Sequence, residues 1–269
     1  MFEIAGQACL TFVTLAVMFC PLERAFPEYR QGMIRARSGL DLVFFLSQQL
    51  CTGYVIVAAL SWLHVRSAAL PLAAAREAFA SQPFALCVIE VVMLGDLLAY
   101  WGHRAQHRFE LLWRFHAVHH SSEHLDWLAA NREHPLDGLY TQFLLNLPLI
   151  LTGFMLDGAA GIVVFRGAWA VFIHSNVRIP LGPLAWILGS PQLHHLHHER
   201  SRTTYNFGNL SPWTDLLFRT HRAASLEPPK LGLLEPFPDT FIEMLLQPLT
   251  PKSREDRREA RAVQNAAQP

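Results

Sequence analysis

The sequence is poor in charged residues and has no excess of either sign. Only 16% of its 269 residues are charged, compared with about 25% in average proteins. The 22 acidic residues balance the 22 basic ones. A chain without net charge lacks the basic surface that binds nucleic acids or polyphosphates, so we expect no nucleic-acid partner. Because 51% of the residues are hydrophobic, the chain has ample apolar surface to bury, which excludes a disordered protein.

Motifs of several common enzyme classes are also missing. The chain contains no H-E-x-x-H zinc-protease helix, no E-x-x-H of soluble carboxylate di-iron bundles, no G-x-G and no G-x-S-x-G. Its four cysteines all lie in apolar segments and form no C-x-x-C pair, which indicates buried thiols. The N-terminus lacks the basic region and cleavage site of a signal peptide, so we expect none to be removed.

Long apolar runs predict a membrane protein. Ile4–Cys20 and Leu42–Leu63 contain no charged residue, and Pro83–Trp101 contains only Glu90 and Asp96. A helix needs roughly 20 mainly apolar residues to cross a bilayer, and these runs approach that length.

A fourth run, Leu139–Leu156, is followed by the turn signal Asp157–Gly158 and by the shorter apolar stretch Ala159–Ile173. We interpret these segments as a helical hairpin that enters and leaves the membrane on one side. The four runs together predict an all-α fold, an integral-membrane bundle of about four spans or hairpins.

Basic residues indicate the orientation of this bundle. The second loop, over residues 64–82, contains only Arg66 and Arg76. The loops on the other side are richer in arginine: Arg24, Arg30, Arg35, Arg37, Arg104, Arg108, Arg114 and Arg132. The positive-inside rule places the arginine-rich side in the cytoplasm. Because the histidine-rich segments follow the same spans, we expect a cytoplasmic, histidine-rich helical cap. The bias toward arginine over lysine favours a bacterial inner membrane.

Thirteen of the 14 histidines lie between His103 and His221. An H-x-x-x-H box covers His103–His107, and two H-x-x-H-H boxes begin at His116 and His194. Residues three and four apart share one face of a helix. Neutral imidazole is a common ligand of zinc, iron, copper and nickel. Eight imidazoles are too many for one ion, so the boxes predict two metal ions at the cytoplasmic end of the bundle.

Two further side chains share the stripe of the first box. Asp96, Tyr100, His103 and His107 are spaced i, i+4, i+7 and i+11, which places them on one side of a helix. An acid and a phenol beside two imidazoles predict hydrogen-bonding support for the metal ligands. Ordinary helix packing is the alternative for both residues.

At these boxes the chain resembles the fatty acid hydroxylase/sterol desaturase superfamily, integral-membrane enzymes with a non-haem di-iron centre. The resemblance runs from about Pro21 to Thr220 and is carried by a set of short segments: Pro21–Pro27, Tyr100–His107, Phe115–Ser122, His134–Gly138, His174–Asn176, His194–His198 and Asn206–Gly208. The chain departs from the family pattern at Phe218-Arg-Thr220, where the family often has Phe-Gly-Thr. An arginine cannot take a positive φ cheaply, so we expect this loop to differ.

The resemblance implies metal binding by nine histidines: His103, His107, His116, His119, His120, His174, His194, His197 and His198. It adds His134 as a tenth candidate, for which an interfacial, hydrogen-bonded histidine is an equal alternative. His195 falls on the opposite side of its box, and His64, His124 and His221 lie outside the boxes, so we expect no ligand role for these four.

The resemblance also implies an activity and a division of the chain. It implies two iron ions, O2 as co-substrate, and hydroxylation or desaturation of a lipid such as a fatty acyl chain, sterol, ether lipid or carotenoid. Membrane helices are expected over residues 1–82, a fatty acid hydroxylase-type catalytic domain over 83–222, and an amphipathic segment with a polar tail over 223–269. Trp62, Phe84, Phe143, Phe154, Phe165 and Trp169 are candidates to line a lipid path, with lipid-facing or core packing as the alternative.

Electrons for this chemistry need an outside source. The chain has no dinucleotide, flavin or iron–sulfur motif, so the resemblance implies a separate donor, a ferredoxin or a cytochrome b5-type protein with its reductase. Arg104, Arg108, Arg114 and Arg132 are candidates for its docking surface, although topology and headgroup contact also explain them.

Two other classes remain open from the residues alone. A histidine-rich membrane protein that stores, senses or transports metal is one alternative. A transporter places its ligands near the bilayer midplane on broken helices, whereas these boxes lie beyond the ends of the apolar runs. A bis-histidine haem protein is the other, but it requires histidine pairs on facing helices.

Overall fold

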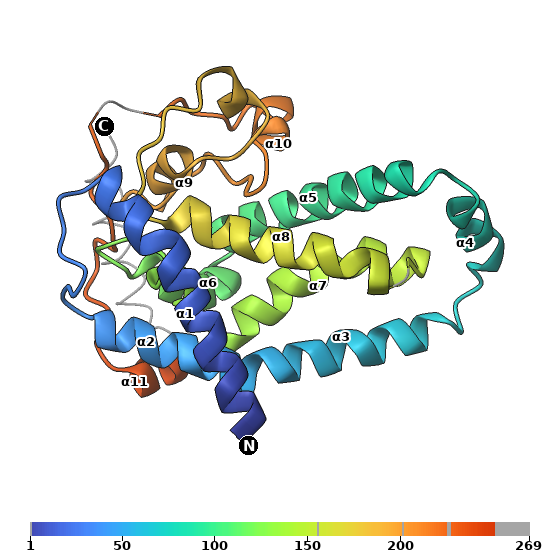
Figure 1. Cartoon of the computed structure of the whole chain (residues 1–269), viewed down its shortest axis with the longest axis horizontal. Helices are drawn as coiled ribbons and strands as arrows, with labels where there is room; N and C mark the ends of the chain where they lie inside the picture. Colours follow the sequence, from blue (N-terminus) through green and yellow to red (C-terminus); the bar gives the residue numbers. More distant parts are fainter. Residues whose placement is uncertain (1, 155, 201, 225–226, 251–269) are drawn as a thin grey trace.

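The computed structural model describes residues 2–154, 156–200, 202–224 and 227–250 (Figure 1). These residues form helices joined by loops, and the described part of the chain contains no strand beyond two isolated bridges, Pro27 with Val177 and Glu199 with Leu231. The all-α membrane bundle predicted from the sequence is therefore confirmed.

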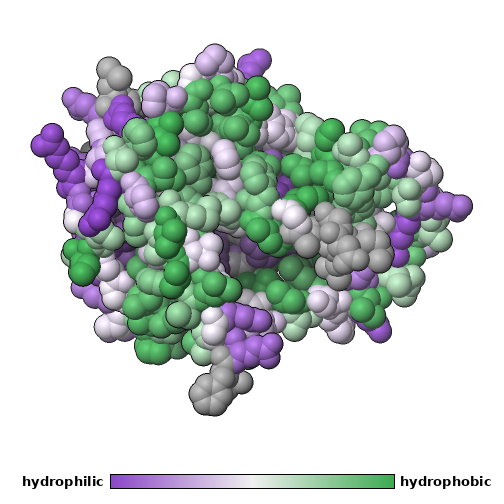
Figure 2. Space-filling view, viewed as in Figure 1, coloured by the Kyte–Doolittle hydropathy of each residue, from purple (hydrophilic) through white to green (hydrophobic). Residues whose placement is uncertain are grey.

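Within the described residues, three helical segments are long and apolar enough to cross a membrane. They are α1 (Phe2–Ala25), a continuous rod made of α2 (Ser38–Ser47), the π-helical turn η1 (Gln48–Thr52) and α3 (Gly53–Ser67), and α5 (Phe84–Arg108). Only 11–22% of the residues in their apolar windows are buried inside the protein, so a large part of each helix is available for contact with lipid. Figure 2 shows the same distribution, with hydrophobic side chains over the middle of the molecule and hydrophilic ones mainly at its left and right ends.

The predicted hairpin is present, but its turn lies elsewhere. Helix α7 (Pro135–Thr152) ends at Gly153, whose φ of 67° is the left-handed conformation that closes many helices. Helix α8 (Leu156–His174) then runs back beside it, so the predicted turn at Asp157–Gly158 is wrong and both residues lie inside α8. In Figure 1, α7 and α8 lie between α5 and α3, with α4 (Ala73–Ala80) at the far right end.

The remaining elements form a cap at the left end of Figure 1. They are α6 (Glu110–His120), η2 (Ala129–Asn131), η3 (Gly182–Trp186), α9 (Pro191–His197), α10 (Trp213–Leu217), α11 (Phe241–Leu246) and η4 (Gln247–Leu249). The amphipathic segment expected near the C-terminus corresponds to α11, where the fully buried Met244 packs against Phe44 and Val118. The expected polar tail after residue 250 lies outside the described residues.

Arg219 lies in a backbone conformation that glycine adopts more easily than arginine. Its φ is 58°, in the left-handed region that L side chains rarely adopt. The loop therefore takes a positive φ here although the residue is an arginine, and whether it differs from the family's loop stays a prediction. The turn persists because its neighbours hold it: the Thr220 and His221 amides both donate to the carbonyl oxygen of Asp215, at 2.8 and 3.2 Å.

A buried ion network ties α2 to the cap. The Asp41 carboxylate pairs with Arg35 at 2.7 Å and with Arg132 at 2.6 Å, and Arg35 also forms a two-pronged contact with Asp126. The Asp41 and Arg132 side chains are almost fully buried. Because buried charges are costly when unpaired, the network depends on each of its members.

Substituting Asp41→Leu is expected to lower the free energy of unfolding by about 3–5 kcal/mol, since it leaves two buried guanidinium groups without their shared carboxylate. The measurement is thermal unfolding of the purified protein in detergent. Asp239→Ala is a suitable control, because Asp239 pairs with Arg37 at the surface and such exposed pairs contribute little. Equal melting temperatures for the two variants would contradict the assigned role of Asp41.

Candidate metal centre

The three histidine boxes and His174 come together as two groups of imidazoles. The first group is His103, His107, His116, His120 and His197; the second is His119, His174, His194 and His198. In each group, one potential ligand nitrogen per ring lies within 4.8 Å of all the others. The nine histidines singled out in the sequence are thus the members of these groups.

Each H-x-x-H-H box contributes to both groups. Neighbouring residues on an α-helix point about 100° apart, so His119 and His120 on α6 face different groups. His197 and His198 likewise separate, one into each group. The two sites are therefore interleaved, with α6 and α9 lying against both.

Backbone carbonyls determine which ring nitrogen carries the proton in the first group. The Nδ1 atoms of His103, His107 and His197 lie 2.8, 2.9 and 2.8 Å from the carbonyl oxygens of Phe207, Thr203 and Tyr205. A carbonyl oxygen only accepts, so each Nδ1–H donates and each Nε2 of the neutral ring presents a lone pair. These three Nε2 atoms are buried and have no hydrogen-bond partner.

Three more imidazoles are oriented in the same way. His116 Nδ1 donates to Asp137 Oδ2 at 2.9 Å, and the other oxygen of Asp137 accepts from Gln106 at 2.6 Å. In the second group, His119 Nδ1 donates to the Arg132 carbonyl at 3.1 Å and His174 Nδ1 to the Ala170 carbonyl at 2.6 Å. Six of the nine rings therefore direct an unprotonated Nε2 into the site.

The unprotonated nitrogens lie close to one another. His174 Nε2 is 3.0 Å from His119 Nε2 and 2.8 Å from His194 Nε2. No proton is available between His119 and His174, so their lone pairs repel unless a cation lies among them. Two nitrogens at right angles on a metal, each about 2.05 Å from it, are about 2.9 Å apart. The donor set and its spacing therefore fit a bound metal ion.

Burial keeps the imidazoles of the cap neutral. It lowers the pKa of His197 to about 3, although the hydrogen bond to the Tyr205 carbonyl acts to raise it, and it lowers the pKa of His119 to about 4. Burial and the neighbouring imidazoles also lower the pKa values of His120, His194 and His198. Neutral imidazole is the form that binds metals, so the rings need lose no proton to bind one at neutral pH.

His134 lies outside both groups. Its Nε2 donates to the Leu245 carbonyl at 3.1 Å, and its Nδ1 accepts from the Leu136 amide at 3.1 Å, which caps α7. Because both of its ring nitrogens are hydrogen-bonded, His134 has the hydrogen-bonded role that was considered as the alternative to metal binding. His195 is also outside the groups, fully buried, with its ring against Tyr29.

Asp96 and Tyr100 do not hydrogen-bond any histidine of the described chain. Asp96 pairs with Arg166 at 3.0 Å, and the Tyr100 hydroxyl bonds Thr220 at 2.8 Å and accepts from Arg104. The helical stripe is real, but both side chains find partners on other elements. The carboxylate that orients a ring is Asp137, which lies in the segment His134–Gly138 that resembles the family but was not predicted as a site residue.

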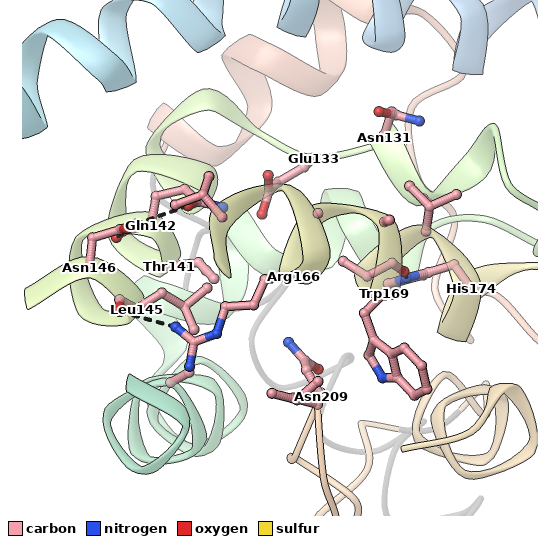
Figure 3. Close-up of a pocket in the computed structure, with 18 of the residues that line it drawn as sticks. Asn131, Glu133, Thr141, Gln142, Leu145, Asn146, Arg166, Trp169, His174 and Asn209 are labelled. Carbon is pink, nitrogen blue, oxygen red and sulfur yellow. Dashed lines mark hydrogen bonds between the residues drawn. The ribbon is translucent and has the colours of Figure 1, made fainter. Parts of the chain in front are cut away.

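A cavity of about 940 Å³ leads from the imidazoles into the bundle. Its walls are mainly apolar and come from α1, η1, α3, α5, α7, α8 and the loop around Asn209 (Figure 3). It reaches His103 and His116 of the first group and His119, His174 and His194 of the second. Of the six aromatic residues proposed for a lipid path, Trp169 alone lines it, while Trp62, Phe84 and Phe165 are exposed on the outer surface.

Known proteins resemble the part of the chain that contains the histidine boxes. The fatty acid hydroxylase family pattern matches residues 88–220. An ornithine lipid hydroxylase from Rhizobium tropici is 32% identical over 181 residues, covering 65% of this chain and 54% of that protein. The human alkylglycerol monooxygenase is 32% identical over 155 residues, covering 56% of this chain and 34% of that protein.

A very-long-chain aldehyde decarbonylase from Oryza sativa subsp. indica is 30% identical over 140 residues, covering 46% of this chain and 22% of the plant protein. The chain thus spans about half the length of the bacterial relative and less of the other two. No solved structure matches it. The matched region contains every box and both groups of imidazoles, so through residues 88–220 this chain belongs to the fatty acid hydroxylase family.

Proposed function

We propose that this protein is a membrane-bound, non-haem di-iron oxidoreductase that uses O2 to oxidise a C–H bond of a lipid. The observation that carries the proposal is the pair of imidazole groups at the end of a mainly apolar cavity among membrane helices. Lipid-oxidising relatives support it.

In this proposal the first group holds one iron ion and the second group holds the other. The five imidazoles of the first group exceed the four ligands of a typical zinc site, which favours iron. When bound, the iron pair supplies the activation of O2 that makes an unactivated C–H bond reactive.

The protein's own residues position the ligands and the lipid. Asp137 and the carbonyls of the cap hold the rings in one tautomer and orientation. The apolar cavity wall holds the chain of the substrate near both groups and keeps water from the reacting carbon. The product is a hydroxylated lipid, or an alkene if a second hydrogen is lost.

The electron donor is proposed to be an external protein, a ferredoxin or a cytochrome b5-type protein, that approaches the cap from the cytoplasm. The membrane is proposed to be a bacterial inner membrane. Among the four arginines considered for docking, Arg132 is buried with Asp41, so a docking surface would use Arg104, Arg108 and Arg114.

Metal analysis and O2 consumption test the proposal together. We expect about two iron ions per chain, no Soret band, and lipid-dependent O2 uptake when a reduced ferredoxin system and a lipid extract are supplied. Isotopically labelled O2 should appear in the product if it is an alcohol. Full metal content with no O2 uptake on any lipid fraction would favour the metal-storage or transport alternative and would overturn the proposal.

A further inference from the structure

Three polar atoms in the wall of the cavity are buried without a partner. They are Arg166 Nε, Trp169 Nε1 and Asn209 Oδ1, two donors and one acceptor. Buried polar groups are nearly always hydrogen-bonded, because leaving one unpaired is costly. In Figure 3, Asn209 lies between Arg166 and Trp169, and all three side chains point into the space beneath α8.

Helix α8 connects these donors to the metal centre. Arg166, Ala170 and His174 are spaced by four residues and share one stripe of the helix, and Trp169 lies three residues after Arg166 on the adjoining side of that stripe. At a rise of about 1.5 Å per residue, Trp169 and Arg166 lie about 8 and about 12 Å along the axis from His174. The unpartnered donors are therefore set back from the imidazoles by several carbon–carbon bonds of an extended chain.

The charge of Arg166 is already neutralised. Its Nη2 pairs with Asp96 at 3.0 Å and donates to the Val92 carbonyl at 2.7 Å, and its Nη1 donates to the Leu145 carbonyl at 3.3 Å. Gly95 permits this close approach, since a Cβ there would lie 2.7 Å from Nη1. With the charge paired and only Nε unpartnered, the position suits an uncharged acceptor better than an anion.

Asn209 is held by the same loop that orients the metal centre. Gly189 lies directly against the backbone of Asn209. A Cβ at Gly189 would be 2.2 Å from the backbone carbonyl oxygen of Asn209. Asp215 accepts from the amides of Phe207 and Gly208 at 2.9 and 2.7 Å, and the Phe207 carbonyl accepts from His103. The backbone that carries this acceptor is thus held in place relative to the imidazoles.

We propose that Arg166, Trp169 and Asn209 form a polar subsite for an uncharged group that both accepts and donates hydrogen bonds, an amide or a hydroxyl, within the substrate's chain. Its oxygen accepts from Arg166 Nε or from Trp169 Nε1, and its N–H or O–H donates to Asn209 Oδ1. The subsite deepens the proposed function and rests on it, because it sets which carbon of the lipid lies beside the imidazoles.

Equilibrium binding to the purified protein in detergent tests this without turnover. The probes are four molecules of equal chain length: an alkane, a fatty acid methyl ester, a fatty acid N-methyl amide and an alkane with a mid-chain hydroxyl. The amide or the hydroxylated chain should bind about tenfold more tightly than the hydrocarbon, and more tightly than the ester, which leaves Asn209 unpaired. The better of the two identifies the group.

Trp169→Phe and Asn209→Leu should reduce that preference to about twofold or less, because the first removes the Nε1 donor, the second removes the Oδ1 acceptor together with its amide nitrogen, and both keep most of the side-chain volume. Phe165→Leu on the exposed side of α8 is the matched control and should keep the preference. Equal binding of all four probes by the unmodified protein, or a preference unchanged in both variants, would overturn the subsite. A retained preference in a protein that never consumes O2 would count against the proposed function alone.

Discussion

A His174→Ala protein is expected to lose lipid oxidation by at least about 100-fold and to retain markedly less iron. His174 Nε2 lies within 3.0 Å of two other ligand nitrogens, His119 and His194, so its removal takes one of four donors from the second group. Even the partners that merely orient metal-binding histidines typically contribute 10–100-fold to affinity or activity, and a ligand itself should contribute more.

Iron per chain by elemental analysis and product formation by mass spectrometry check this result. His124→Ala is the matched control, because it removes the same side chain from a neighbouring turn outside both groups. Full iron content and full activity in the His174 variant would contradict its place in the centre.

The metal-free protein should lose stability steeply as the pH falls below about 6.5. In the folded chain the pKa of His197 is lowered to about 3 and that of His119 to about 4, whereas unfolded histidine titrates near 6.5. Between these values the unfolded chain binds more protons, so acidification favours unfolding until the folded pKa is reached. The full stability is present above about pH 6.5.

The size of the effect follows from the number of rings. Each such histidine contributes about 1.4 kcal/mol per pH unit within its window. Six rings in the cap with lowered pKa values together give on the order of 8 kcal/mol per pH unit: His119, His120, His194, His195, His197 and His198.

Thermal unfolding of chelator-treated protein between pH 7.5 and 5 measures this dependence. Iron-loaded protein should melt at a higher temperature throughout, because only the folded chain offers the assembled ligand set. A melting temperature of the metal-free protein that stays constant over the same range would show that the rings are not buried in neutral form.

The membrane helices were predictable because local properties determine them. The runs at Ile4–Cys20 and Leu42–Leu63 lie within two of the helices long enough to cross a bilayer, and the run at Pro83–Trp101 begins one residue before the third. Backbone groups in lipid must be satisfied within the segment, so hydrophobicity and length alone predict a helix. The hairpin turn was misplaced because Gly153 and Asp157–Gly158 both carry turn signals.

The partners of individual side chains were less predictable. Asp96 shares a helical stripe with two histidines, but its charge pairs with Arg166, 70 residues later in the chain. Arg132 carries a positive charge that sequence rules place at a membrane surface, yet it lies buried beside Asp41. Sequence spacing describes one helix at a time, whereas a buried charge takes whichever partner the packed helices bring to it.

The sequence alone determined the number of candidate imidazoles and their grouping into boxes, and it led to the prediction of two metal ions. Only the tertiary structure decided how the nine histidines divide, with His119 separated from His120 and His197 from His198. It also showed that Asp137 and distant carbonyls direct the nitrogens, and that Arg166, Trp169 and Asn209 meet in one cavity. Helical periodicity fixes the angle between side chains that follow one another along a helix. Which residues those side chains then meet depends on helices that lie far apart in the sequence.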